Sequence, residues 1–459
     1  MKKNFIKTFA AFVFAAILSC SCLTGCDSFG GRGNSNKVQF MHIWPEHATV
    51  IREIVDDFMV ENPDIEIDIV ESTQSTIRSS LQNLVGTSDM PDVFFWWGKE
   101  MGVWAQEDIT LALDDVIAPY MDKFTDVAAV DAGKIDGHYY FAPFRTTGYP
   151  IVYNKTFFDA NNITVPDTLE GFETLLKTLK DKNVTPLSTY GTGGGTQDLL
   201  RQGFYAFHAV QSGEYDDPNF LSGRLQPDDD MYTANAYALL KAKKWLKTDR
   251  FLGTVSTTEQ AQKEFLEKKA AMTIINSNYI ADFVAEAAKR DIAVGVMGLP
   301  APAAIKENSY VNGNFDGFCI NKETNKKEQC KKFVAYLMSD AVQQKFGRST
   351  DVIMVNNTVT YEKSWVQQLA GVMQVSGKYD YAYDYNKGQI DNTNYNLVHN
   401  FVDGPDMSLS SAENLFKKYF ENVKSAMADR MLNATPVDFI ARTSPKKPYD
   451  NAWLTQGLS

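Results

Sequence analysis

The sequence predicts an α/β fold built on mainly parallel strands. From residue 37 onward, short alternating apolar stretches are separated by apolar residues at helical spacing, in the order strand, helix, strand, helix, strand. This order is typical of parallel strands joined by helical crossovers. The length of 459 residues and the hydrophobic share of 44% supply apolar material for more than one core, and they exclude a disordered chain.

Apolar periodicity defines the first five elements. Ile51, Ile54 and Phe58 recur on one helical face, and Asn62-Pro63 ends that helix. Right-handed crossovers allow an order in which the first and third strands are neighbours, and ligands bind beyond the carboxyl ends of such strands. The five elements are expected at residues 37–43 (strand), 51–62 (helix), 65–69 (strand), 77–85 (helix) and 92–96 (strand).

Strands and helices continue along the rest of the chain. Ile135-Asp136-Gly137-His138 is typical of a tight hairpin turn. Asp167 with Glu170, and Ser410 with Glu413, have the spacing of capping boxes at helix starts. Strands are expected near 149–153, 187–190, 271–275, 292–297 and 316–320, and helices near 172–179, 197–211, 234–247, 259–268, 280–284 and 326–338, before a mainly helical tail.

The first 25 residues have the pattern of a secretory signal. Three lysines precede an apolar run from Phe9 to Leu18, which is too short to span a membrane. The next segment, Leu23-Thr24-Gly25-Cys26, resembles the bacterial lipoprotein cleavage box, in which Cys26 becomes the lipidated N-terminus; ordinary cleavage nearby is the alternative. Residues 26–36 are polar and rich in Gly and Ser, which favours a flexible tether. We therefore expect a chain at the extracytoplasmic face of the bacterial cell membrane, held there by its lipid anchor.

Charge and cysteine content narrow the possible partners. Removing residues 1–25 deletes three lysines and no acidic residue, so the formal net charge falls from −12 to −15. Such acidity argues against phosphate-driven binding of nucleic acid. The sequence leaves open whether Cys319 and Cys330 form a disulfide or remain two buried thiols.

No motif for catalysis or cofactor binding is recognisable. The Gly-rich segment 191–195 lacks the lysine and hydroxyl of a P-loop. His42 and His47 have a poor spacing for a metal site. Paired acids such as Asp56-Asp57 fit solvated helix faces or turns, the alternative being glycosidase chemistry. We expect a protein that is not an enzyme and that needs no cofactor and no metal.

Five segments, in order along the chain, resemble motifs of the extracellular solute-binding proteins of ABC importers, in the sugar-binding family that includes maltose-binding protein. Each motif alone is modest, but their order behind a lipoprotein signal is specific. The segments are Phe58 with Asn62-Pro63-Asp64-Ile65 (F-x-x-x-N-P-x-I), Asp89–Phe94 (D-x-P-D-V), Tyr153-Asn154-Lys155 with Phe158, Pro166 and Thr168 (Y-N-K-x-x-F … P-x-T), Phe265–Met272 (F-x-x-G-K-A-A-M, with Lys268 in place of Gly) and Phe333–Ser339 (F-x-x-Y-L-x-S).

This resemblance implies a two-lobe periplasmic-binding-protein fold (type II-like). Each lobe is expected to be a mainly parallel sheet flanked by helices, with the ligand cleft between the lobes. Lobe one is expected at 37–146 and 297–345, and lobe two at 150–290 and 350–459. The hinge crossings would then lie near 145–148, 295–297 and 348–351.

The resemblance also implies the activity and the partners. A monomer would capture a sugar or oligosaccharide by hinge closure and deliver it to ABC permease subunits. Sugars offer C–H patches that pack on aromatic rings and hydroxyls that bind polar side chains, so the candidate contacts are aromatic and polar residues near the cleft. They are Trp44, Glu46, Trp96, Trp97, Lys99, Arg145, Tyr149, Tyr190, Asn278, Tyr279, Asp316, Tyr383 and Asp384.

Several of these roles have alternatives. Trp96 matches the ligand-stacking position of the family after the third strand, whereas Lys99 departs from the acidic residue of maltose-binding protein and argues against maltose. Trp44 and Trp97 either face the crevice or cap the core. Arg145 either contacts ligand or holds the hinge through a salt bridge. The tyrosine-rich run 379–385 is either a stacking platform or a surface strand.

Two other classes of protein remain as alternatives at this point. One is a secreted glycoside hydrolase with a carboxylate pair in the same kind of cleft. The other is a lipid-anchored ligand sensor that feeds a signalling receptor. A relative that binds cationic peptides or polyamines would also suit the net charge of −15.

Overall fold

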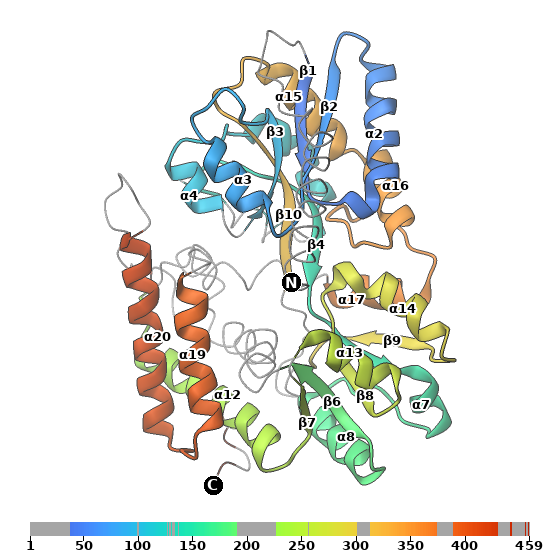
Figure 1. Ribbon diagram of the computed structural model, residues 1–459, viewed down its shortest axis with the longest axis vertical. Helices are drawn as coiled ribbons and strands as arrows, with labels where there is room; N and C mark the ends of the chain where they lie inside the picture. The colour runs from blue at the N-terminus through green and yellow to red at the C-terminus, as the bar shows by residue number, and fades with distance from the viewer. Residues whose placement is uncertain are drawn as a thin grey trace, which may run out of the picture.

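Two five-stranded sheets form the framework of the protein, which is described by a computed structural model (Figure 1). The structure describes residues 37–98, 101–125, 137–190, 226–255, 257–300, 313–373 and 389–429, with a few single residues between and after these ranges, Val130 among them. The first sheet lies in the upper half of Figure 1 and the second sheet in the lower half.

The first sheet contains, in spatial order, β2 (Glu66–Glu71), β1 (Lys37–His42), β3 (Val93–Trp97), β10 (Gly313–Ile320) and β4 (Ala142–Gly148). β1 pairs in parallel with both β2 and β3, so the first and third strands are neighbours, as the sequence allows. β10 runs antiparallel to β3 and β4. The sheet is therefore mixed, with one strand running against the other four.

The second sheet repeats this plan. Its order is β7 (Leu252–Val255), β6 (Thr185–Tyr190), β8 (Ala270–Ile274), β5 (Ile151–Asn154) and β9 (Val294–Met297). β6 pairs in parallel with β7 and β8, and β5 is antiparallel to β8 and β9. The prediction of an α/β fold with mainly parallel strands is confirmed in strand direction, and the reversed strand of each sheet is an addition that the periodicity did not indicate.

Helices cover the first sheet and bury one apolar face each. In α2 (Ala48–Glu61), Val50, Ile54 and Phe58 are buried, and the helix ends where the Asn62 side-chain amide donates to the Phe58 carbonyl at 2.8 Å. The other main helices here are α3 (Ile77–Leu84), α4 (Met101–Gln106), α5 (Asp114–Ile117), α15 (Lys327–Leu337) and α16 (Asp340–Thr350), with short 3-10 turns η1 (Pro45–His47) and η3 (Ala118–Lys123). Together they enclose one hydrophobic core.

The second sheet has helices on both faces and two hydrophobic cores. One face carries α8 (Leu169–Asp181), α12 (Asp229–Lys247), α19 (Gln389–Asp403) and α20 (Leu409–Asp429). The other carries α13 (Thr258–Leu266), η6 (Ser277–Tyr279), α14 (Ile280–Ala288) and α17 (Ser364–Met373). The short α7 (Lys155–Ala160) follows β5.

Neither predicted capping box forms. The N-cap of α8 is Thr168 instead of Asp167: its backbone is extended, and its hydroxyl accepts from the Gly171 N–H at 3.1 Å. At the start of α20, the Ser411 N–H donates to the Ser408 hydroxyl at 3.4 Å. Glu413 instead accepts a hydrogen bond from Thr233 of α12 at 2.6 Å, because α20 packs on α12.

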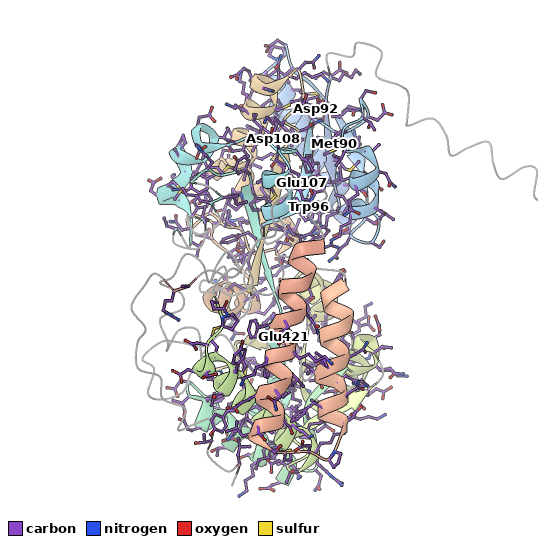
Figure 2. All side chains as sticks on the ribbon, turned by 90° about the vertical axis from the view of Figure 1, so that its left-hand side faces the viewer. Met90, Asp92, Trp96, Glu107, Asp108 and Glu421 are labelled. Atoms are coloured by element: carbon purple, nitrogen blue, oxygen red, sulfur yellow. The ribbon has the colours of Figure 1, made fainter. Side chains whose placement is uncertain are left out.

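Helices α19 and α20 run side by side and close one side of the lower half, as Figure 2 shows with Glu421 labelled on α20. A buried lysine of α12 fixes this pair. The Lys243 ammonium donates to the carbonyls of Phe401, at 2.6 Å, and Asp406, at 2.5 Å, beyond the last turn of α19. A cation at a helix C-terminus is favourable because the carbonyl ends carry partial negative charge.

Cys319 and Cys330 are both buried thiols that are not joined in a disulfide. The hairpin turn at Ile135 is confirmed: Ile135 and His138 exchange two backbone hydrogen bonds, and Gly137 has φ +86°, which favours glycine.

A buried carboxylate, Asp92, fixes the first sheet where β3 begins. Asp92, which is fully buried, accepts from the Gln39 N–H at 2.8 Å, the Thr324 hydroxyl at 2.5 Å and the Lys326 ammonium at 3.1 Å. It thereby ties β1 and β3 to the loop after β10. Burial raises the pKa of Asp92, but the three hydrogen bonds outweigh burial and leave the pKa below its ordinary value.

We predict that Asp92→Asn lowers the free energy of unfolding by about 2–4 kcal/mol, because an amide puts donors against donors in a buried site. Urea denaturation measures the loss. The same exchange at the exposed Asp57, which pairs with Lys345, is the control and is expected to change stability by less than about 1 kcal/mol. Equal effects for the two variants would contradict the assigned role.

His42, the last residue of β1, is also fully buried. Its Nδ1 accepts from the Trp44 N–H at 3.1 Å, which requires that Nδ1 carry no proton. Burial, followed by the positive charges of Arg52 and His47, lowers the pKa of His42 to about 4. Because the unfolded chain titrates near 6.5, it binds more protons than the folded chain between these values.

The contribution of His42 to stability should therefore be complete above pH 6.5 and lost as the pH falls from 6.5 through about 4. The shift corresponds to a loss of about 3 kcal/mol. We expect wild type to exceed His42→Gln in unfolding free energy at pH 7, and the difference to shrink toward pH 4. Denaturant titrations at several pH values measure it, and a difference that stays constant with pH would refute this assignment.

Candidate functional site

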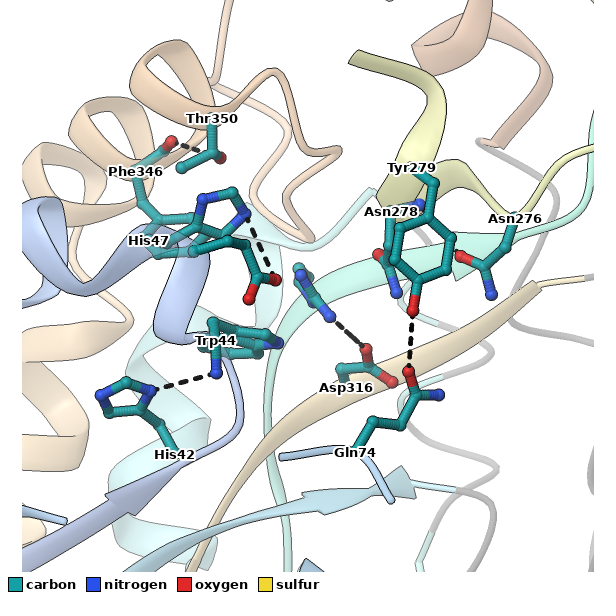
Figure 3. Close-up of polar contacts among 12 residues, drawn as sticks. His42, Trp44, His47, Gln74, Asn276, Asn278, Tyr279, Asp316, Phe346 and Thr350 are labelled. Atoms are coloured by element: carbon teal, nitrogen blue, oxygen red, sulfur yellow. Dashed lines mark hydrogen bonds and ion pairs between the residues drawn. The ribbon is translucent and has the colours of Figure 1, made fainter. Parts of the chain in front are cut away.

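The two sheets meet where β4 ends, and polar contacts join them there. The chain leaves the first sheet at Gly148, whose N–H donates to the Ser277 hydroxyl at 3.1 Å. On the opposite edge of β4, the Thr146 N–H donates to the Ile353 carbonyl at 2.7 Å. The Tyr279 hydroxyl of η6 reaches across to Gln74, beyond the end of β2, at 3.3 Å (Figure 3). We call this region the junction.

A buried ion pair lies at the centre of the junction. The Arg145 guanidinium donates through Nε and Nη2 to one Asp316 oxygen at 3.1 and 3.0 Å, and both side chains are 2% exposed. Burial lowers the pKa of Arg145, and Asp316 opposes this shift. The third nitrogen, Nη1, is buried and has no hydrogen-bond partner in the structure. The sequence allows either ligand contact or a hinge salt bridge for Arg145, and the structure shows the salt bridge.

Gly317 makes this pairing possible. The register between β10 and β4 shifts after Asp316, so that Gly317 lies opposite Pro143. A Cβ on residue 317 would lie 2.0 Å from the Ala142 carbonyl oxygen, which no side chain tolerates. Only glycine therefore lets the two strands approach closely enough for Asp316 to reach Arg145.

The Trp44 ring packs against the Arg145 guanidinium of the ion pair. The Arg145 guanidinium carbon lies 4.3 Å from the centre of the Trp44 ring, a cation–π contact. The indole also stacks on Phe144, at 5.7 Å between ring centres, and it is only 2% exposed. Of the two roles that the sequence leaves open for Trp44, capping the core agrees with its burial in this conformation.

The two tryptophans at the end of β3 are buried as well. Trp96 is 2% exposed and packs on Trp104, with ring centres 4.4 Å apart (Figure 2 shows its position). Trp97 is 5% exposed, and the Arg78 guanidinium covers its ring at 3.7 Å. In this conformation the neighbouring aromatic rings cover Trp96, and its contact with ligand stays a prediction.

The remaining predicted contacts lie around the junction or outside the described residues. Glu46 is exposed in η1, next to His47. From η6, which packs beside the second sheet, come Asn278, whose buried Oδ1 has no hydrogen-bond partner, and Tyr279, which is 52% exposed. Tyr149 is 40% exposed at the crossing. Cys26, Lys99, Tyr383, Asp384 and the Tyr190 side chain lie outside the described residues, as does the run 379–385.

Two residues of the junction, Gln74 and Ser277, were not among the predicted contacts. Gln74 follows the carboxyl end of β2, and the rule that ligands gather at such ends would have pointed to it. Ser277 carries the hydrogen bond to Gly148, and only the three-dimensional structure reveals that contact.

A small pocket lies beside the junction, where β3 ends. It is bounded by Gly98, Met101, Val130, Tyr139, Phe141 and Phe315, with Tyr140 and Pro143 completing its wall. Gly98 directly follows Trp97, and Phe315 directly precedes Asp316. The pocket thus belongs to the same end of the first sheet as the ion pair.

The junction is suited to binding. It combines exposed tyrosine rings, an exposed carboxylate at Glu46 and three buried polar atoms, Arg145 Nη1, Trp44 Nε1 and Asn278 Oδ1, that lack hydrogen-bond partners. Within the described ranges, no group of three or more His, Cys, Asp or Glu side chains could hold a metal ion. Nor does any helix that the structure describes have the length and apolarity to cross a membrane.

The chain is similar to known binding proteins. The profile of the bacterial extracellular solute-binding proteins matches residues 44–344. A maltotriose-binding protein of Pyrococcus abyssi is 28% identical over 123 residues, 26% of each chain. The aligned region thus spans about a quarter of that relative, and a multiple sugar-binding protein of Streptococcus mutans is 24% identical over 39% of its own length.

Solved structures share the fold. A family 1 extracellular solute-binding protein from Bifidobacterium longum subsp. infantis superposes with a TM-score of 0.68 at 18% identity, covering 85% of this chain and 100% of that one. The apo form of RafE from Streptococcus pneumoniae gives a TM-score of 0.66 at 20% identity, with the same coverage, and RafE has also been solved with raffinose.

These identities are low, so the structural likeness shows the two-lobe fold and no more. The profile match, by contrast, covers well over half of the chain. Family and fold neighbours are binding proteins rather than enzymes, and the family is consistent with an extracytoplasmic location. The chain belongs to the bacterial extracellular solute-binding proteins.

Proposed function

We propose that this chain captures a sugar or oligosaccharide between two hinged lobes and delivers it to the permease of an ABC importer. The observation that carries the proposal is the junction, where exposed tyrosines lie beside buried polar atoms of β4 and η6 that have no hydrogen-bond partner. Rings that pack against C–H patches and polar atoms that bind hydroxyls are what a sugar requires. The raffinose complex of RafE and the names of the curated relatives support this ligand class.

The proposed lobes approximate the two sheets, although Met297 and Leu299 pack in a core of the second sheet. Lobe one comprises about 37–146 and 297–345, and lobe two about 150–290 and 350–459. Residues near 145–148, 295–297 and 348–351 act as hinges. The third crossing extends further along the chain, because Val352 and Met354 pack in the core of the first sheet, whereas Ile353 packs in the core between the second sheet and α14 and α17. Ligand favours the closed state because only closure brings both polar sets into contact with it.

The proposal places the protein outside the cytoplasmic membrane. The signal is removed, Cys26 carries the lipid, and residues 26–36 form the tether that lets the monomer reach the permease subunits. A micromolar affinity, about −8 kcal/mol, would allow both capture and release.

A thermal-shift screen tests this function directly. We expect at least one neutral mono- or oligosaccharide to raise the unfolding temperature, because a ligand that binds only the folded state stabilises it by mass action. Chromatography of the same mixtures should return the sugar intact. A panel of sugars without any shift would refute sugar binding, and accumulation of hydrolysed product would indicate a glycoside hydrolase instead.

Tyr279 is the residue at which the site is best tested. Tyr279→Ala should weaken binding of the best sugar about ten- to a hundredfold, as expected for the loss of an aromatic contact. The unfolding temperature should change little, because half of the side chain is already exposed. Calorimetric titration measures the affinity, and Val60→Ala, at a residue that is 81% exposed, is the control. Unchanged affinity in Tyr279→Ala would remove Tyr279 from the site.

A further inference from the structure

The segment at the start of α3 contacts two aromatic residues that the sequence predicts as ligand contacts. The Arg78 guanidinium carbon lies 3.7 Å from the centre of the Trp97 ring. Four residues earlier, the Gln74 side-chain oxygen accepts from the Tyr279 hydroxyl at 3.3 Å, across the junction (Figure 3). The segment that carries Arg78 therefore lies in the junction itself.

Arg78 covers the face of the Trp97 ring. Carbon atoms pack best at about 3.5–4.0 Å, so a distance of 3.7 Å to the ring centre places the guanidinium directly over that face. The rings of Phe95 and Trp96 stand at 85° and 64° to the same ring, and Trp97 is only 5% exposed. A sugar that packs a C–H patch on Trp97 needs the face that Arg78 occupies. The guanidinium and a sugar ring therefore exclude each other.

The register of the first sheet places Trp97 beside the ion pair of the junction. Asp316 of β10 lies opposite Trp97 of β3 and also opposite Arg145 of β4. Residues directly opposite in antiparallel strands have their side chains on the same face. The three side chains therefore stand in a row on one face of the sheet, near the carboxyl ends of β3 and β4. The group that covers Trp97 is thus part of the candidate site.

Only a side chain has to move for Trp97 to be uncovered. The backbone of the segment is fixed, because the Ile77 N–H donates to the Thr73 carbonyl at 3.0 Å and the Ile77 side chain is fully buried. Arg78, by contrast, is half-buried. Its long side chain can change rotamer while α3 keeps its place.

We infer that Arg78 is an intramolecular competitor of the sugar. In the ligand-free chain its guanidinium occupies the Trp97 face, and a sugar packs there only after Arg78 has left. The inference rests on the proposed function and names the residue that limits its affinity. Because only the uncovered fraction of the molecules can bind, the contact weakens the apparent affinity by that fraction.

The affinity of an Arg78 variant tests the competition. Raffinose, maltotriose and the other sugars of the thermal-shift panel are titrated calorimetrically into the full mature chain and into Arg78→Ala. We expect Arg78→Ala to bind about three to ten times more tightly, because the cation–π contact no longer has to be broken. Arg290→Ala is the control: it removes the same charge from an exposed arginine that pairs with Glu286, and the affinity should not change. Thermal unfolding verifies that each variant is folded.

Fluorescence quenching by acrylamide tests the covering of Trp97 without any ligand. Arg78→Ala should raise the share of the tryptophan emission that acrylamide quenches, because the Trp97 ring becomes accessible. In a Trp97→Phe background, the same exchange should leave the quenched share unchanged. This comparison assigns the effect to Trp97 and not to another tryptophan.

The outcomes separate the inference from the proposed function. Unchanged or weaker sugar binding in Arg78→Ala would overturn the competition and leave the proposed function intact, and weaker binding would make Arg78 a ligand contact instead. An equal quenched share in wild type and Arg78→Ala would overturn the competition as well. If neither chain binds any sugar of the panel, the proposed function fails and the competition with it.

Discussion

The buried pair of Arg145 and Asp316 is the interaction on which the junction depends. It joins β4 and β10, which come from segments 171 residues apart, at the point where the chain leaves the first sheet. Truncating one member of a buried ion pair typically costs about 3–5 kcal/mol, because the other charge is left without compensation. The pair also holds the guanidinium over Trp44, so the first core and the crossing to the second sheet are built as one unit.

Local periodicity was sufficient to predict the strands and helices near the N-terminus and the α/β class. β1 and β3 are neighbours, as a right-handed crossover allows. Periodicity carries no information on strand direction, however. The antiparallel direction of β5 and β10 could therefore not be predicted from it. Each of these strands takes its place through pairing with residues far away in sequence. The cap of α8 shows the same limit on a smaller scale, since the choice of Thr168 over Asp167 depends on the backbone angles of one residue.

The candidate site was predictable in position but not in exposure. Arg145, Asp316, Asn278 and Tyr279 meet at the junction, because strand ends and helix starts gather on one side of each sheet. Whether an aromatic residue faces ligand or core depends on its neighbours in space. Trp96 is covered by Trp104 from a later helix, a contact that no spacing rule contains.

The electrostatics of the junction favour a neutral ligand. Because Asp316 already compensates the charge of Arg145, an anionic ligand would bring a second negative charge into a buried site with one guanidinium, and a cationic ligand would compete with that guanidinium for the same carboxylate. A neutral ligand with hydroxyls avoids both penalties and can still pack on the exposed rings of Tyr149 and Tyr279. The ion pair that fixes the first sheet therefore also makes the proposed sugar a better match for the junction than any ion.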